Sequence, residues 1–250
     1  QYSHKYLDTD EFFDDIFVKT NIAEAINADF SKRSWNGDPV NICGVTDAYQ
    51  PLEKEYVLMP KVIETFIRHK NPLTITTKST LLLRDIDLLE ELNRVARVNV
   101  YVSASAIDES IREKIEPFAS PTIERLQMLN EVSKRGIYTS VLMMPIIPHL
   151  TDDIENLEAI FRISKENGTR SIIPQILHLR GNTKQVFFGH AKKLFPKLVD
   201  DLKPLYKDGA YIDKQYLENF QEKIRVLRRK YNFYNETCEK KEARKQLELL

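Results

Sequence analysis

Short β-branched segments alternate along the chain with longer segments of helical periodicity, and this alternation constrains the fold more than any other feature. Strands separated by single helices are typical of βαβ units, which have parallel strands and right-handed crossovers. The predicted strands are apolar along most of their length, so we expect a sheet covered on both faces. They lie at residues 40–46, 73–77, 98–103, 137–144 and 171–177, with a further short strand at 16–19.

Helices are predicted between the strands, where apolar residues recur at intervals of three and four. Thr80 and Thr151 are placed to cap two of them, and Gly136 follows the end of a third, where a left-handed residue is usual. Toward the C-terminus the strand pattern stops, and residues 189–206 and 213–231 are predicted to be helical. The fold class is therefore α/β, either an open doubly wound sheet or a partial barrel.

Charge is balanced over the 250 residues, with 37 Lys and Arg and 37 Asp and Glu, but residues 178–250 carry 17 basic and 10 acidic side chains. A basic segment binds polyanions by releasing counterions, although a charge run is more often a solvated helix face. No apolar run reaches the roughly 18 residues of a membrane span, and no signal peptide is recognisable. The two cysteines, Cys43 and Cys238, fit a reducing compartment, so we expect a soluble cytoplasmic protein.

Several common catalytic motifs are absent from the sequence. The seven glycines form neither G-x-G-x-x-G nor G-x-x-x-x-G-K-[ST], which disfavours dinucleotide and P-loop nucleotide binding. H-E-x-x-H and G-x-S-x-G are missing as well. The five histidines lack partners at metal-ligand spacing, and for His149 and His178, which lie near strand ends, contact with a substrate is one alternative to a surface role.

Polar side chains follow the predicted strands at their carboxyl ends, which meet at one edge of a parallel sheet and hold the ligand in such folds. Asp47 follows the first strand, Lys78 the second, and Ser103 and Ser105 end the third. A carboxylate for an amine and an ammonium for a carboxylate suit a zwitterionic, hydroxyl-bearing ligand. Taken singly, Asp47 is as readily a turn residue, but capping does not require Lys78, so the set predicts a binding site.

Residues 42–53 are I-C-G-V-T-D-A-Y-Q-P-L-E, and several shorter blocks follow later in the chain. The later blocks are I-T-T-K-S at 75–79, L-R-D at 83–85, E-P at 116–117, R-L at 125–126 and M-P-I-I-P-H-L-T-D at 144–152. In this order they resemble the radical S-adenosylmethionine (SAM) proteins related to spore photoproduct lyase. The resemblance covers residues 2–180, with a weaker match over 211–231.

The resemblance implies a partial (β/α)6 TIM-like barrel over residues 1–180, with its first strand upstream, and a helical extension over 181–250. It implies a radical SAM enzyme, in which an electron from a [4Fe-4S] cluster cleaves SAM to methionine and a 5′-deoxyadenosyl radical that takes hydrogen from the substrate. A flavodoxin or ferredoxin would donate the electron. Matched positions imply SAM binding by Gly44, Thr46, Asp47, Lys78, Ser103, Ser105, Pro145 and Ile147, and substrate binding by Tyr49, Gln50 and His178.

Two departures from the family pattern are visible. The C-x-x-x-C-x-x-C loop that holds the cluster is not in these 250 residues, so we expect it upstream of Gln1 and expect the chain as it stands to be inactive. The hydrogen-donating cysteine of spore photoproduct lyases aligns with Gly44, and a shift of one residue to Cys43 reverses the side chain's direction in a strand, so DNA photoproduct repair is not expected. The alternatives are a metal-dependent barrel hydrolase or lyase and a non-catalytic nucleic-acid-binding protein.

Overall fold

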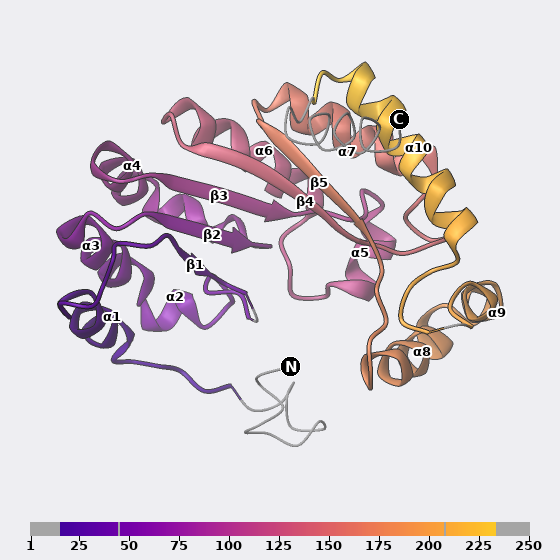
Figure 1. The fold of residues 1–250 in the computed structure, drawn as a ribbon, viewed down its shortest axis with the longest axis horizontal. Coiled ribbons are helices and arrows are strands. Elements are labelled where there is room, and N and C mark those ends of the chain that lie inside the picture. The colour runs from indigo at the N-terminus through magenta and orange to yellow at the C-terminus, as the bar shows by residue number, and fades with distance from the viewer. Residues whose placement is uncertain (1–15, 45, 208, 234–250) are drawn as a thin grey trace, which may run out of the picture.

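A parallel sheet of five strands forms the centre of the computed structural model, which describes residues 16–44, 46–207 and 209–233. The strands are β1 (Val40–Ile42), β2 (Leu73–Thr77), β3 (Val98–Ser103), β4 (Tyr138–Ile146) and β5 (Ser171–Ile176). They lie in the order β1-β2-β3-β4-β5, so each strand pairs with its neighbours along the chain (Figure 1). The predicted α/β class with parallel strands is confirmed.

Helices connect the strands and continue beyond the sheet. They are α1 (Ile22–Phe30), α2 (Glu53–Tyr56), α3 (Met59–His69), the 3-10 helix η2 (Thr80–Asp85), α4 (Ile86–Val95), α5 (Glu109–Ile115), α6 (Thr122–Lys134), α7 (Ile154–Glu166), α8 (Thr183–Leu194), α9 (Pro196–Leu205) and α10 (Lys214–Lys230). Every crossover advances by one strand, and right-handed connections of this kind place their helices on one face of the sheet. Figure 1 accordingly shows α3, α4, α6, α7 and α10 in an arc outside the strands.

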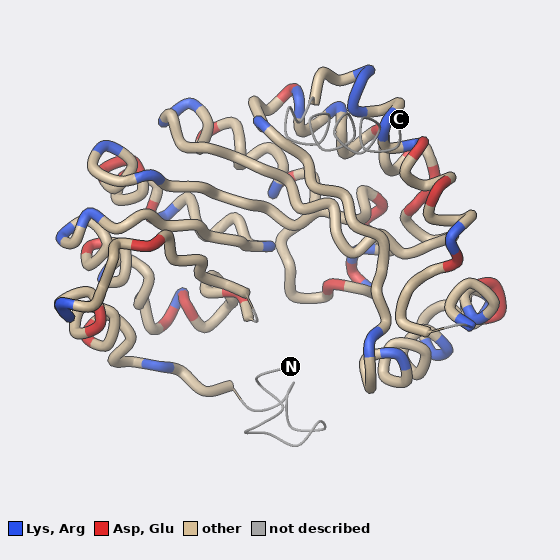
Figure 2. The backbone as a smooth tube through the Cα atoms, in the orientation of Figure 1, with Lys and Arg blue, Asp and Glu red and all other residues tan. Residues whose placement is uncertain are grey.

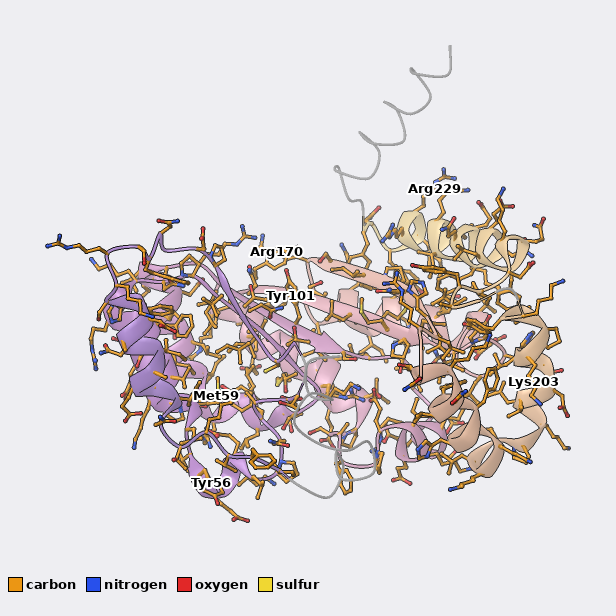
Figure 3. All side chains as sticks on the ribbon, turned by 60° about the horizontal axis from the view of Figure 1, so that its bottom comes forward. Tyr56, Met59, Tyr101, Arg170, Lys203 and Arg229 are labelled. Carbon is orange, nitrogen blue, oxygen red and sulfur yellow. The ribbon has the colours of Figure 1, made fainter. Side chains whose placement is uncertain are left out.

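Residues of β2 and β3 alternate between a buried face and a half-buried face. The helix-covered positions are fully buried, as Ile75 and Val100 are. The alternate positions are polar and half-buried: Thr74 accepts a 2.9 Å hydrogen bond from the amide of Asn99, and Tyr101 is labelled on the sheet in Figure 3. The expectation of a sheet covered on both faces is therefore wrong for these strands. No residue of the five strands is charged, and Figure 2 shows the charges on helices and loops.

Three strand and helix predictions change for local reasons. β1 ends at Ile42 rather than at residue 46, because Cys43 adopts a left-handed conformation with φ of 79° that cannot continue a strand. Residues 16–19 form no strand. The helix predicted at 189–206 is two helices, α8 and α9, because Pro196 cannot donate the N–H that would continue α8 and instead begins α9.

Two predicted helix caps are one or two residues away from the observed ones. Ser79 caps η2 by accepting a hydrogen bond from the N–H of Leu81, and Asp153 caps α7. Thr151 instead accepts a 2.9 Å hydrogen bond from the N–H of Ile147 inside the loop after β4. Gly136 is left-handed after α6, with φ of 75°, as predicted.

The C-terminal helices are anchored to the ends of β4 and β5. Tyr206, after α9, is fully buried and donates a 2.7 Å hydrogen bond to the carbonyl of Leu177. From α10, Tyr216 donates to the carboxylate of Asp152 at 2.6 Å, and Lys223 donates to the Asp152 carbonyl at 2.9 Å. Burial is the main cause that raises the pKa of Tyr216, and its bond to Asp152 adds to it. One hydrophobic core includes side chains from the sheet, α9 and α10, and the predicted division at residue 180 stays a prediction.

Candidate functional site

The carboxyl ends of β2, β3 and β4 lie side by side because the three strands pair in parallel. Lys78 directly follows β2, and Ser103 ends β3. The hydroxyl of Ser103 donates to the carbonyl of Met144 in β4 at 3.2 Å, and the carbonyl of Lys78 accepts from the N–H of Ser120, between α5 and α6, at 3.0 Å. Two of the residues predicted to bind SAM therefore lie on one rim of the sheet.

Asp47 joins the loop after β1 to the end of β2. Its carboxylate accepts hydrogen bonds from the hydroxyl of Thr77 at 2.9 Å, from the backbone N–H of Lys78 at 2.7 Å and from the N–H of Tyr49 at 2.9 Å. A carboxylate offers about four lone-pair sites, so these donors use most of its capacity. The interpretation of Asp47 as a turn residue is thus correct. Its binding of an amine stays a prediction, in which the amine would share the carboxylate with these three donors of the chain.

The ammonium of Lys78 points to a buried carboxylate rather than to Asp47. Its Nζ lies 2.8 Å from Oε1 of Glu116, and the Lys78 side chain is 42% exposed. Oε2 of Glu116 lies 2.9 Å from Nη2 of Arg125, whose side chain is fully buried in α6. Burial lowers the pKa of Arg125 and Glu116 opposes this, but a guanidinium stays charged in either case. Lys78 is therefore a half-exposed cation held at the strand end by a buried ion pair.

A second ion-pair network fixes the loop between β1 and α3. The guanidinium of Arg84 binds both carboxylate oxygens of Asp85, at 2.7 and 2.8 Å, and Oε1 of Glu53 at 2.6 Å. The oxygens of Glu53 also accept the N–H groups of Leu58 and Met59 at the start of α3. Hydrogen bonding to Asp85 is the largest cause that raises the pKa of Arg84. The Y-Q-P-L-E and L-R-D blocks of the sequence therefore meet in one ion-pair network, called the lock below, which consists of Glu53, Arg84 and Asp85 with the groups bound to them.

Tyr49 belongs to this lock. Its side chain is 1% exposed, and its hydroxyl donates to Asp85 at 3.1 Å. Burial first, and the neighbouring carboxylate of Asp85 second, raise the pKa of Tyr49, so it stays protonated. This burial does not favour contact between Tyr49 and a substrate, which stays a prediction. The neighbouring Gln50 is half-buried, and its carbonyl accepts from the N–H of Glu53 at 2.9 Å.

The remaining predicted residues differ in exposure. Gly44, Thr46 and Pro145 are exposed, while Ser105 is 1% and Ile147 5% exposed. A Cβ atom at Gly44 would meet no atom within 4 Å, so open space lies beside this residue.

His178 lies after β5, at the end of the sheet away from β1. Its Nδ1 is 3.2 Å from the amide nitrogen of Gln175, and its ring packs edge-on against Tyr211 with 5.0 Å between the centroids. The guanidinium of Arg180 lies 5.1 Å over the same tyrosine ring. Substrate binding by His178 stays a prediction.

Cys43 is a protonated thiol at neutral pH. Burial raises its pKa to about 12, against a smaller opposing effect of the hydrogen bond from the N–H of Ala48, whose nitrogen lies 3.2 Å from Sγ. The part of the chain that the structure describes has no group of three or more His, Cys, Asp or Glu side chains able to hold a metal ion. With two cysteines in 250 residues, the residues present do not fit the ligand set of an iron–sulfur cluster.

Glu116 and Arg125 are site residues for which the sequence predicts no role, although both stand in blocks that match the family, E-P and R-L. A signal for Arg125 exists, because Met128, Leu129 and Val132 stand three, four and seven positions after it and are buried in α6. An arginine on the apolar stripe of a helix predicts a buried charge with a buried partner. Glu116 lies outside regular structure, where no periodicity marks it.

The fold is a parallel α/β partial barrel with cationic and hydroxyl groups at its strand ends. Barrel enzymes bind their ligands at this carboxyl edge of the sheet. The family model of the Radical SAM superfamily matches residues 23–162. The chain belongs to the radical SAM superfamily, an enzyme family whose members use SAM and a [4Fe-4S] cluster. No helix in the described ranges is both long and apolar enough to cross a bilayer.

The chain is also similar to curated proteins from other organisms. The chain is 32% identical over 232 residues to an uncharacterized protein of Mycobacterium tuberculosis, covering 92% of this chain and 68% of that protein. It is 29% identical over 137 residues to an uncharacterized protein of Methanocaldococcus jannaschii, covering 55% of this chain and 49% of that protein.

Among solved structures, a cysteine-to-serine mutant of spore photoproduct lyase has the same fold, with a TM-score of 0.62 and 14% identity. A mutant of that lyase with bound AdoMet and dinucleoside spore photoproduct has a TM-score of 0.60. Each match covers 86% of this chain but 65% of the lyase, so the chain spans about two thirds of the length of that enzyme. The predicted partial-barrel fold is confirmed.

Proposed function

We propose that this chain binds SAM at the carboxyl ends of its strands and is the barrel of an enzyme that cleaves SAM reductively. Lys78 would bind the carboxylate of the methionine moiety, with Ser103 and Ser105 beside it. Thr46 and Asp47 would lie near the amino group, and the segment from Pro145 to Ile147 would line the adenine. When SAM binds a reduced [4Fe-4S] cluster, the pair supplies a 5′-deoxyadenosyl radical.

One observation carries the proposal: a half-exposed ammonium stands at the end of β2, beside the hydroxyl-bearing end of β3. An ammonium is the donor that a carboxylate requires, so Lys78 fits the amino-acid end of SAM. The hydroxyl of Ser103 fits less well, because it is buried and already donates to the carbonyl of Met144. Asp47 fits the amine less well, because the chain itself already donates to its carboxylate. The thiolates for the cluster would have to come from outside these 250 residues.

The alternatives receive less support. A metal-dependent hydrolase needs several ligand side chains close together, and the described residues contain no such group. A nucleic-acid-binding helix needs free basic side chains, and three of those on α10 are engaged: Lys223 donates to Asp152, Arg225 pairs with Glu222 and Lys230 pairs with Glu158. Arg229 is exposed and forms no ion pair with the described residues. Residues 240–245, which add four basic side chains, lie outside the described residues. A flavodoxin- or ferredoxin-like electron donor and a cytoplasmic location remain parts of the proposal.

The test uses the full-length gene product, reconstituted anaerobically with iron and sulfide. We expect it to form 5′-deoxyadenosine from SAM in the presence of dithionite. Lys78→Gln should weaken SAM binding by roughly 10- to 150-fold, because one charge-assisted contact is worth roughly 1.5–3 kcal/mol. Lys61→Gln, on the exposed side of α3, is the matched control and should bind normally. A cluster-loaded protein that forms no 5′-deoxyadenosine, or an unchanged affinity of Lys78→Gln, would overturn the proposal.

A further inference from the structure

Three charged residues form a chain that leads from the rim into the core. Nζ of Lys78 lies 2.8 Å from Glu116, and Glu116 lies 2.9 Å from Arg125. The exposed fraction of the side chain falls from 42% at Lys78 to 7% at Glu116 and 0% at Arg125. The charges alternate in sign, and only the outermost positive charge reaches solvent.

Arg125 is costly to bury, and packing alone does not account for it. Its Nη1 donates to the carbonyl of Ser103 at 2.5 Å and its Nη2 to the hydroxyl of Thr122 at 2.8 Å. Its Nε is buried with no hydrogen-bond partner within the described ranges. Buried ion pairs are often no more stabilising than apolar residues of similar size. An apolar side chain on this stripe of α6 would avoid the cost, so the arginine calls for a different reason.

Charge balance supplies that reason. Without Arg125, Glu116 would neutralise Lys78, and the pair would offer no net charge to an anionic ligand. With Arg125 the three residues carry a net charge of +1, located at the exposed end. Lysine has three N–H donors, so Lys78 can donate to Glu116 and to a ligand carboxylate at the same time.

We infer that Arg125 is a positioning residue that offsets the charge of Glu116 and thereby keeps Lys78 able to bind the carboxylate of SAM. This inference rests on the proposed function. Arg125 would touch no ligand, yet it would control the affinity for one functional group of the ligand, the carboxylate. A purely structural arginine would affect both halves of the ligand alike.

The experiment compares two ligands by calorimetry on the purified chain. S-Adenosylhomocysteine and 5′-methylthioadenosine share the adenosine and the thioether, but only the first has the amino-acid moiety, with the carboxylate that Lys78 would bind and the amino group that lies near Asp47. We expect R125M to weaken binding of S-adenosylhomocysteine about tenfold, the loss of one charge-assisted contact, and to change 5′-methylthioadenosine binding less than about threefold. The double variant R125M/E116Q should regain S-adenosylhomocysteine affinity to within about threefold of wild type, because Lys78 is then no longer neutralised.

Controls separate the possible failures. E113Q removes one negative charge, as E116Q does, but at a 69% exposed position of α5, and it should bind both ligands normally. If K78Q keeps the preference for S-adenosylhomocysteine, the proposed SAM site itself is wrong. If K78Q loses that preference but R125M keeps it, only the inference about Arg125 fails. Should R125M not fold, the double variant decides alone: weak binding by a folded R125M/E116Q means a structural role and overturns the inference.

Discussion

Asp47→Asn tests how strongly the loop after β1 depends on its tie to β2. The amide keeps one acceptor oxygen but places an NH2 group where Oδ2 accepts the backbone N–H of Lys78 at 2.7 Å. That hydrogen bond is lost, and the bonds from Thr77 and Tyr49 then have a neutral acceptor. Hydrogen bonds to charged groups contribute about 1.5–3 kcal/mol and neutral ones about 0.5–1.5 kcal/mol, so we expect a loss of about 2–4 kcal/mol in the free energy of unfolding.

Urea and thermal denaturation at neutral pH measure this loss. For a chain of this size, 1 kcal/mol lowers the melting temperature by roughly 2–4 °C, so the expected decrease is roughly 4–16 °C. Asp38→Asn makes the same chemical change at an exposed aspartate ahead of β1 and should leave the melting temperature within about 2 °C. If the two variants were equally stable, the carboxylate of Asp47 would not be holding the loop, and its role as a free amine ligand would gain support.

Three further predictions concern other contacts. Arg84→Met leaves two buried carboxylates unpaired and should lower the free energy of unfolding by about 3–5 kcal/mol in urea; a loss below about 1 kcal/mol would contradict the lock. In a Cys238→Ser background, Cys43 should resist iodoacetamide up to pH 9. Because the folded pKa of Cys43, about 12, exceeds the unfolded value, the free energy of unfolding should decline as the pH rises from 9 toward 12. Rapid alkylation of Cys43 at pH 8 would refute the raised pKa. Tyr216→Phe leaves the carboxylate of Asp152 without its 2.6 Å donor and should cost about 1.5–3 kcal/mol, against no change for the exposed Tyr56→Phe.

The strands and their parallel direction are the part of the fold that the sequence predicts best, because hydrophobic periodicity within each strand and helix encodes the βαβ units locally. The strand order does not follow from this pattern, which suits an open doubly wound sheet as well as a partial barrel. Its failures are also local: the left-handed Cys43 ends β1 early, and Pro196 divides one predicted helix into two. Neither the side-chain pattern nor the spacing reveals the first of these, since the backbone conformation of a single non-glycine residue depends on its tertiary contacts.

The candidate site is less predictable than the fold. Strand ends follow from topology, so Lys78 and Ser103 can be placed on one rim from the sequence. Their partners cannot, because Lys78 pairs with Glu116, which lies in an irregular loop, and Glu116 in turn pairs with Arg125 of the following helix. Spacing along the chain carries no information about such contacts. The sequence therefore identifies which groups reach the rim but not which of their charges are already neutralised.

The sequential strand order has a consequence for how this protein is made. Each strand pairs with the strand synthesised just before it. The sheet can therefore grow during translation by one βαβ unit at a time, without waiting for distant segments. The loop after β4 does wait for a distant segment, because the carboxylate of Asp152 accepts a hydrogen bond from the hydroxyl of Tyr216, 64 residues later in the chain. A nascent chain stopped before α10 would have all five described strands but would lack the Tyr216 hydroxyl at Asp152, so α10 completes the edge where the ligand is proposed to bind.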